Sequence, residues 1–241
     1  MLQYEKTVIL IPTYDEAINV EKMARTIFKT YPGISLVIID DGSPDGTGNI
    51  VKKLQGDFPN LHLIERTKKQ GIGKAYIAGF RWALEKEYEF IFEMDCDFSH
   101  DPDDIQKLLE AAQDNDLVIG SRYINGISIV NWPLKRLMLS YLASVYTRFI
   151  TRIPIRDTTG GFKCFTRNAL KSLRFDEIVS SGYSFQIEVN YKLWCKGFKI
   201  KEVSTIFYER RDGQSKMNNE IVFEAIFSVI FLRLKKIFGT L

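Results

Sequence analysis

Short apolar segments alternate with helical segments along the first half of the chain, and this alternation limits the possible folds more than any other feature. Apolar runs that predict strands cover residues 7–12, 36–39, 61–65, 90–94 and 117–120. Segments with helical character cover residues 17–30, 48–54, 74–86 and 103–113. Buried strands separated by helices predict an α/β fold, with a doubly wound, mostly parallel sheet and helices on both faces.

The second half of the chain is richer in helices. We expect helices over residues 130–151, 184–196 and 221–237, and a glycine-containing turn that leads into a short strand over residues 157–165. Extended segments are expected over residues 199–203 and 205–208. Since no repeat, low-complexity tract or linker composition divides the chain, residues 1–241 are expected to form one domain.

Two of the expected helices, 130–151 and 221–237, combine apolar residues with basic ones, which is typical of amphipathic helices on a membrane surface. The basic residues are Lys135, Arg136, Arg148, Arg152, Arg233, Lys235 and Lys236. The alternative is that both helices simply pack on the sheet. The longest apolar run, residues 221–234, is shorter than the ~20 residues that span a bilayer.

The composition disfavours several functional classes. The 33 basic and 30 acidic residues leave a net charge of only +3, so no nucleic acid is expected as a partner. The three cysteines, Cys96, Cys164 and Cys195, form no CxxC pair, which disfavours a disulfide framework or a zinc site and fits a reducing compartment. No signal peptide is recognisable at the N-terminus, so a cytoplasmic protein is expected.

Asp95 and Asp97 stand one residue apart where the expected strand 90–94, with its apolar run Phe90-Ile91-Phe92, ends. In open parallel sheets, ligands bind at the carboxyl ends of the strands. Two carboxylates that leave a strand through a tight turn can bind one hard cation, and that cation can bridge phosphate oxygens. The alternative is that both are solvated turn residues.

The turn after the first strand, residues 12–16, contains no glycine and so lacks the GxGxxG of dinucleotide-binding folds. Any bound phosphate must therefore be held by a metal and by basic side chains. The basic candidates, each of which could instead be a solvated surface residue, are Lys68, Lys69, Arg122, Arg210, Arg211 and Lys216. Asp41 and, less strongly, Asp40 are candidates to accept hydrogen bonds from a base or ribose, and His100 is a candidate to contact the same site.

Eight motifs together resemble a known family. They are IPTYDE, IDDGSPDGT, Gly71-Ile72-Gly73, MDCDFSHDP, GSRY, Thr159-Gly160-Gly161-Phe162, GYSFQIE and RRDGQSKM, and they span roughly residues 7–232. In this order they resemble the dolichyl-phosphate (polyprenyl-phosphate) mannosyltransferases, inverting glycosyltransferases of family 2 with the GT-A fold. The chain resembles the members without C-terminal transmembrane helices. Such members rely on a membrane partner subunit or lie on the membrane surface.

The resemblance implies transfer of mannose from GDP-mannose to a polyprenyl monophosphate, by a peripheral enzyme on the cytoplasmic face of a membrane. It assigns residues 1–125 to the nucleotide sugar and residues 126–241 to the acceptor, with the loop 157–163 shaping the acceptor site. The implied pocket for guanosine contains Pro12, Tyr14, Glu16, Ile39 and Asp41. Asp95 and Asp97 would bind Mg²⁺ or Mn²⁺ beside the backbone of Cys96, and Arg122, Arg210 and Lys216 would contact phosphates. Asp97 and Arg122 would be the catalytic residues.

The sequence departs from the family pattern at three positions. Ser99 stands where some members carry a glutamine as a third metal ligand, Cys96 replaces an alanine, and Glu209 replaces an aspartate. The departure at Ser99 leaves the completeness of the metal site open. Two alternatives remain at this point: the same reaction with another donor, such as UDP-glucose, and a nucleotide-sugar-binding subunit without turnover.

Overall fold

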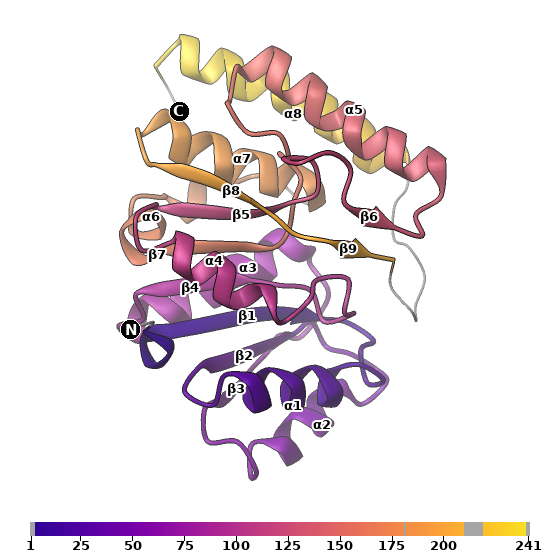
Figure 1. Cartoon of the computed structure of the whole chain (residues 1–241), viewed down its shortest axis with the longest axis vertical. Coiled ribbons are helices and arrows are strands. Elements are labelled where there is room, and N and C mark those ends of the chain that lie inside the picture. The colour runs from indigo at the N-terminus through magenta and orange to yellow at the C-terminus, as the bar shows by residue number, and fades with distance from the viewer. Residues whose placement is uncertain (1–2, 181, 210–218, 240–241) are drawn as a thin grey trace.

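A computed structural model describes residues 3–180, 182–209 and 219–239. Within these residues seven strands form one sheet in the order β3-β2-β1-β4-β7-β5-β8 (Figure 1). The strands are β1 (Thr7–Thr13), β2 (Ser35–Asp40), β3 (Leu61–Glu65), β4 (Phe90–Glu93), β5 (Leu117–Ser121), β7 (Lys163–Thr166) and β8 (Ile200–Ser204). The predicted α/β architecture is therefore confirmed, with a central, mostly parallel sheet.

Alternate residues of the central strands point into two separate cores, one on each face of the sheet. Val8 and Leu10 of β1 face one core and Ile9 and Ile11 face the other, and all four side chains are fully buried. The first core lies under α3 (Ile72–Glu85), α6 (Arg167–Lys171) and α7 (Gly182–Cys195). The second lies under α1 (Val20–Thr30), α2 (Thr47–Leu54) and α4 (Asp104–Ala111). Burial on both faces explains why these strands read as continuous apolar runs.

The sheet is not parallel throughout. β7 lies between β4 and β5 and runs antiparallel to both, with Glu93 opposite Lys163 and Val118 opposite Cys164. The sequence predicts a short strand here but not its direction or its neighbours. The reason is that β7 begins about forty residues after β5 ends, so no local pattern shows that it inserts between β4 and β5.

The helix expected over residues 130–151 begins later than predicted. Ile129–Val130 is instead strand β6, which pairs with β9 (Phe207–Tyr208) in a small second sheet. Helix α5 covers Leu134–Thr151, and Pro133 before it has an extended backbone with ψ of 137°. A residue that precedes proline is pushed out of the helical region, so Trp132 cannot belong to the helix.

Helices α5 and α8 (Asn219–Ile237) lie side by side, and α8 packs on α7 (Figure 1). The Tyr146 hydroxyl of α5 donates a hydrogen bond to the Ile226 carbonyl of α8 at 3.1 Å. Both helices leave large apolar side chains exposed: Leu134, Met138, Leu139, Tyr141, Leu142, Val145, Phe149, Ile226, Phe227, Ile230, Phe231, Leu234 and Ile237. Of the helices that the structure describes, none combines the length and the apolar character needed to cross a bilayer.

Candidate active site

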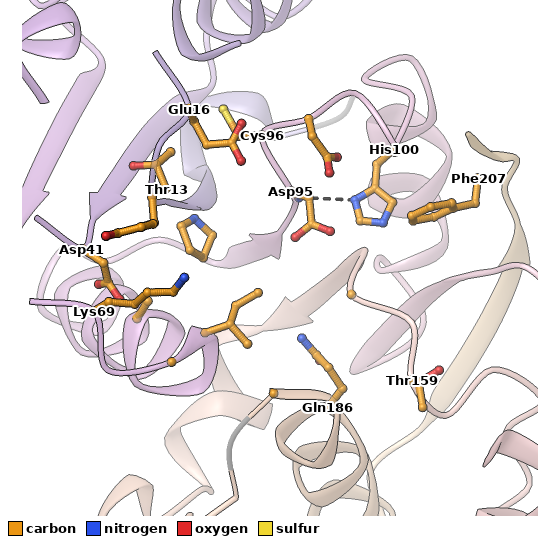
Figure 2. Close-up of a pocket in the computed structure, with 18 of the residues that line it drawn as sticks. Thr13, Glu16, Asp41, Lys69, Asp95, Cys96, His100, Thr159, Gln186 and Phe207 are labelled. Carbon is orange, nitrogen blue, oxygen red and sulfur yellow. Dashed lines mark hydrogen bonds between the residues drawn. The ribbon is translucent and has the colours of Figure 1, made fainter. Parts of the chain in front are cut away.

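A cavity of about 470 Å³ opens at the carboxyl edge of the parallel strands (Figure 2). Loops that follow β1, β2, β4 and β5 supply one part of its walls, as expected for an open α/β sheet, and later segments of the chain supply the rest. The residues that line it are Pro12, Thr13, Tyr14, Glu16, Asp41, Lys69, Gly71, Ile72, Ala75, Asp95, Cys96, Asp97, His100, Arg122, Trp132, Arg136, Thr159, Gly161, Gly182, Gln186 and Phe207. Most of the candidates from the sequence thus meet in one place.

Asp41 lies at one end of the cavity and is held by residues from the loop after β3. Arg66 Nη1 donates to Asp41 Oδ1 at 2.5 Å, and the Gln70 backbone N–H donates to Oδ2 at 3.3 Å. The Lys69 ammonium lies 4.2 Å above the ring of Tyr14 in a cation–π contact. This end of the cavity therefore combines an aromatic face, a fixed carboxylate and a positive charge.

Asp40, the weaker of the two candidates after β2, has a structural role. Its Oδ1 accepts hydrogen bonds from the hydroxyls of Thr13 (2.9 Å) and Ser43 (2.5 Å), and its Oδ2 accepts the Ser43 backbone N–H at 3.0 Å. It joins the end of β1 to the loop after β2. Ile39, which the resemblance assigned to the guanosine pocket, is fully buried in the core and is not among the cavity-lining residues.

Asp95 and Asp97 both line the cavity. The backbone N–H of Asp95 donates to His100 Nδ1 at 3.3 Å (Figure 2). Asp97 Oδ1 accepts the Ser99 backbone N–H at 3.0 Å. Phe98, which lies between Asp97 and Ser99, has a φ of +57°, and this turns the chain sharply after Asp97. Asp95 and Asp97 are both turn residues at a cavity wall, with the Asp95 backbone and the Asp97 carboxylate held by neighbours in the turn.

Within residues 3–180, 182–209 and 219–239, no set of three His, Cys, Asp or Glu side chains converges to hold a metal by itself. Ser99 does not supply a third ligand, because its hydroxyl is buried and Ser99 is not a cavity-lining residue. Burial also raises the pKa of the Cys96 thiol well above its usual value, so the thiol stays neutral. Two carboxylates that would share a cation with phosphate oxygens and water nevertheless match the usual Mg²⁺ donor set.

His100 lies at the cavity wall but is otherwise enclosed by aromatic rings. Its ring stacks on Phe162, with centroids 5.0 Å apart, and meets Phe207 edge-on at 5.2 Å. Burial lowers the pKa of its imidazole, with the charge of Asp97 opposing the shift and that of Arg122 adding to it. The neutral ring therefore accepts the Asp95 N–H and fixes the turn that carries both carboxylates.

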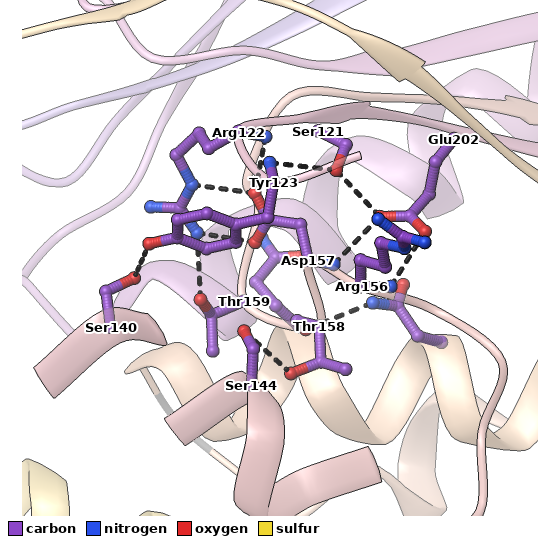
Figure 3. Close-up of polar contacts among 12 residues, drawn as sticks. Ser121, Arg122, Tyr123, Ser140, Ser144, Arg156, Asp157, Thr158, Thr159 and Glu202 are labelled. Atoms are coloured by element: carbon purple, nitrogen blue, oxygen red, sulfur yellow. Dashed lines mark hydrogen bonds and ion pairs between the residues drawn. The ribbon is translucent and has the colours of Figure 1, made fainter. Parts of the chain in front are cut away.

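Arg122 is held by a buried ion pair with Asp157 (Figure 3). Its Nε donates to Asp157 Oδ2 at 2.7 Å, and Nη2 donates to Oδ1 at 2.6 Å and to the Thr159 hydroxyl at 2.9 Å. Glu202 of β8 in turn accepts the backbone N–H groups of Arg156 (2.7 Å) and Asp157 (2.8 Å). The loop 157–163 is thereby fixed against β5 and β8.

Arg136 was predicted only as a basic flank of a surface helix, but it lines the cavity. It lies in the first turn of α5, 4.0 Å above the ring of Trp132, and forms a 3.5 Å ion pair with Glu209. The signal that could have revealed it is Trp132-Pro133, because a proline at a helix start fixes where the first helical side chains point.

A model of the family described as "Glycosyl transferase family 2" matches residues 8–174, more than half of the chain. The chain belongs to this family. Its relatives include a polyprenol monophosphomannose synthase from Mycolicibacterium smegmatis, 39% identical over 93% of this chain and 86% of that protein. An undecaprenyl-phosphate mannosyltransferase from Micrococcus luteus is also 39% identical, over 93% of this chain and 92% of that protein.

A third relative of this glycosyltransferase is the dolichol-phosphate mannosyltransferase of Pyrococcus furiosus, 33% identical over 91% of the chain and 61% of that protein. The predicted resemblance is thus confirmed.

Two solved structures are similar in fold alone. A Pyrobaculum calidifontis mannosyltransferase in complex with GDP-mannose and Mn²⁺ has a TM-score of 0.58 at 16% identity, over 97% of this chain and 74% of that one. Glucosyl-3-phosphoglycerate synthase from Mycobacterium tuberculosis has a TM-score of 0.70 at 15% identity, over 94% of this chain and 78% of that one. They confirm the GT-A fold.

Not every family motif falls within the described residues. Arg210, Arg211 and Lys216 of the RRDGQSKM motif lie outside them. Lys68 is exposed and is not a cavity-lining residue, whereas its neighbour Lys69 is. Of the residues that the resemblance assigned, Pro12, Tyr14, Glu16, Asp41, Asp95, Cys96, Asp97 and Arg122 are gathered around the one cavity.

Proposed function

We propose that this glycosyltransferase moves mannose from GDP-mannose to a polyprenyl monophosphate, giving polyprenyl β-D-mannosyl phosphate and GDP. The observation that carries this proposal is the distribution of charge in the cavity. Carboxylates of Asp95 and Asp97 that suit a metal lie at the same cavity as the guanidinium groups of Arg122 and Arg136. The 39% identical relatives named for mannosyl transfer to polyprenyl phosphates support the choice of sugar and acceptor.

On the donor side, the nucleoside lies at the end formed by Tyr14, Glu16 and Asp41, and the diphosphate lies toward Asp95 and Asp97. These two carboxylates would hold Mg²⁺ or Mn²⁺, with the backbone of Cys96 beside the metal. When bound, the cation neutralises charge that develops on the departing diphosphate. Arg210 and Lys216 remain proposed phosphate contacts.

On the acceptor side, Arg122 and Arg136 bind the lipid phosphate. Arg122 is oriented by Asp157 and Thr159, so its planar guanidinium is held ready for an anion. A phosphate monoester is already ionised at neutral pH, so its oxygen attacks the anomeric carbon without a strong general base. Attack from the face opposite GDP inverts the α-linked donor to a β-linked product.

The two halves of the chain divide this work. Residues 1–125 supply most of the proposed contacts to the nucleotide, and residues 126–241 supply Arg136 and the two candidate membrane helices. Arg136 lies at the start of α5, whose Leu134, Met138 and Leu142 are more than half exposed. We propose that α5 and α8 lie on the cytoplasmic surface of a membrane, either directly or through a partner subunit, so that a lipid phosphate reaches Arg136.

The test is incubation of the purified enzyme with polyprenyl phosphate and radiolabelled GDP-mannose, GDP-glucose or UDP-glucose, with Mn²⁺ or with EDTA. Transfer from GDP-mannose that EDTA abolishes and Mn²⁺ restores is the expected result. Transfer from UDP-glucose alone would overturn the assignment of mannose. Binding of a nucleotide sugar without transfer would favour a non-catalytic subunit.

A further inference from the structure

Three buried polar residues beside the cavity have no role in the proposed chemistry. Glu93 ends β4 and Lys163 begins β7, and they face each other across this antiparallel pair with fully buried side chains. Gln186, in α7, is 4% exposed and lines the cavity. Charged side chains are almost never fully buried without partners, so this cluster requires an explanation.

Lys163 determines which way the amide of Gln186 points. Its Nζ donates hydrogen bonds to Gln186 Oε1 and to the Gln186 backbone carbonyl, the latter at 3.4 Å. An ammonium group has only donors and can accept nothing from an amide NH₂. The amide oxygen is therefore turned toward Lys163 and the amide nitrogen away from it.

Glu93 acts in the same direction through its charge. Burial raises the pKa of its carboxyl to about 7, while the charge of Lys163 and the amide of Gln186 act in the opposite direction. Neither carboxyl oxygen has a hydrogen bond of normal geometry within the described residues. In its ionised form the carboxylate has only acceptors, so it favours the nitrogen end of the amide. Lys163 and ionised Glu93 thus agree on one of the two orientations that an amide can take.

The amide nitrogen is presented to the cavity. Figure 2 shows the nitrogen-bearing end of Gln186 directed into the cavity below Asp95. Within the described residues, Nε2 makes no hydrogen bond of normal length and angle. An amide nitrogen carries two hydrogens, so at least one is available to a ligand even where the other turns toward Glu93. Gln186 is also the only side-chain amide among the described residues that line the cavity.

We propose that Gln186 is a specificity-determining residue that donates a hydrogen bond to a hydroxyl oxygen of the donor's sugar, and that Lys163 and Glu93 are the positioning residues that orient it. This inference rests on the proposed function in one respect, that the cavity binds a nucleotide sugar. A hydroxyl fits better than a phosphate because Lys69, Arg122 and Arg136 already match the anionic groups. A neutral amide held next to a buried carboxyl group has no net charge to offer an anion.

The test compares Gln186→Met and Gln186→Glu with the wild type. Methionine removes the amide N–H without adding charge. Glutamate keeps an oxygen that accepts from Lys163 but replaces the amide N–H with a second oxygen. Calorimetry in Mn²⁺ measures the affinity for GDP, for GDP-mannose and for a series of GDP-mannose analogues that each lack one hydroxyl. Gln106→Met, which removes an exposed amide of α4, is the matched control.

We expect both variants to bind GDP as the wild type does and GDP-mannose about tenfold more weakly, the effect of one lost hydrogen bond. Removing one particular hydroxyl from the sugar should weaken binding to the wild type by about the same factor. It should not weaken binding to Gln186→Met any further. An equal loss of affinity for bare GDP, or analogue penalties that remain unchanged in the variants, would overturn the inference. So would a wild type that binds no nucleotide sugar.

The positioning role has its own test in Glu93→Gln/Lys163→Met, which removes both charges together. This variant should retain the thermal midpoint within a few degrees. Its preference for GDP-mannose over the analogue that lacks the critical hydroxyl should be smaller than that of the wild type. Full discrimination in a folded double variant would show that the pair does not orient Gln186. Since binding is measured apart from turnover, absence of transfer to polyprenyl phosphate would overturn the proposed reaction and not this inference.

Discussion

Arg122 and Asp157 are joined by two short contacts, Nε to Oδ2 at 2.7 Å and Nη2 to Oδ1 at 2.6 Å, with both side chains buried. This pair connects the end of β5 to the loop before β7. A buried ion pair is costly to break, because the remaining charge loses its partner without regaining water. Arg122 therefore matters to folding as well as to any ligand.

Asp157→Asn is expected to lower the free energy of unfolding by about 3–5 kcal/mol, measured by urea denaturation. The double variant Arg122→Met/Asp157→Asn should recover most of that loss, because it leaves no charge buried and the amide oxygen can still accept the backbone N–H of residue 122, but it should remain inactive. Asp176→Asn is the control, since Asp176 pairs with Arg81 on the exposed surface and should change stability by less than about 1 kcal/mol. An unchanged stability in Asp157→Asn would contradict the structure.

Asp97→Asn should weaken Mn²⁺ binding in the presence of GDP and reduce turnover by about 10²-fold or more, because the cation loses a charged ligand. Asparagine can still accept the Ser99 N–H, so the turn should persist. Asp101→Asn is the control, since Asp101 is exposed in the same loop and only accepts the Asp103 N–H. Turnover that is undiminished in Asp97→Asn would disprove the metal role.

The buried imidazole of His100 should contribute a fall in the free energy of unfolding as the pH drops below about 6.5, the ordinary pKa of histidine, while Glu93, whose pKa is raised to about 7 by burial, contributes in the opposite direction. Burial lowers the pKa of His100 in the folded state, so in this range the unfolded chain binds a proton that the folded chain does not. In His100→Asn, whose Oδ1 can accept the Asp95 N–H, the fall between pH 7 and pH 5 should be shallower. Denaturation in EDTA at both pH values measures this, and equal slopes would contradict it.

Gly79→Ala should destabilise the protein by about 1–3 kcal/mol, although alanine favours helices by about 1 kcal/mol over glycine. A Cβ at this position of α3 would lie 2.6 Å from Ile39 Cδ1 and 2.9 Å from Leu10 Cδ1, which is too close. Gly48→Ala in α2 is the matched control, because its Cβ would meet nothing closer than 3.5 Å. Thermal midpoints that rise in both variants would show that the core beneath α3 is looser than the structure indicates.

Phe149→Asp and Phe227→Asp should each reduce binding to vesicles that contain anionic phospholipid by roughly tenfold or more, since an apolar aromatic side chain contributes about 1.5–3 kcal/mol when buried. Both side chains are more than two-thirds exposed, so stability should not change. Ile18→Asp is the control, since Ile18 is 77% exposed and precedes α1, a helix at the opposite end of the molecule from α5 and α8 (Figure 1). Vesicle binding that is equal in all three variants would argue against the membrane role of α5 and α8.

The strands and helices whose limits follow from the local pattern of apolar and polar residues could be predicted from the sequence. The strand that precedes Asp95 and Asp97 begins with three buried apolar residues, and its end could be placed to within one residue. The order of the strands was not predictable in full. β7 has only four residues, Lys163–Thr166, and nothing in them indicates that they lie between two strands that come earlier in the chain.

The site was predictable where its residues belong to recognisable motifs, and less so where their role depends on distant partners. Arg136 reaches the cavity only because Trp132 and Pro133 set the start of α5. Lys163 and Glu93 each looked like one polar residue among apolar neighbours, and only the pairing of β4 with β7 brings them together. Charged residues inside otherwise apolar strands are the signal that could have drawn attention to them.

The position of β7 also bears on how the chain is assembled during its synthesis. When the ribosome has added residue 121, β4 and β5 both exist but have no partner for their facing edges until residues 163–166 emerge. At about 5–20 residues per second that delay is roughly 2–8 s. During this interval two apolar strand edges stay open, and such edges promote aggregation. A nascent chain halted before Lys163 should therefore depend on chaperones, and residues 1–125 alone should not be obtainable as a stable fragment.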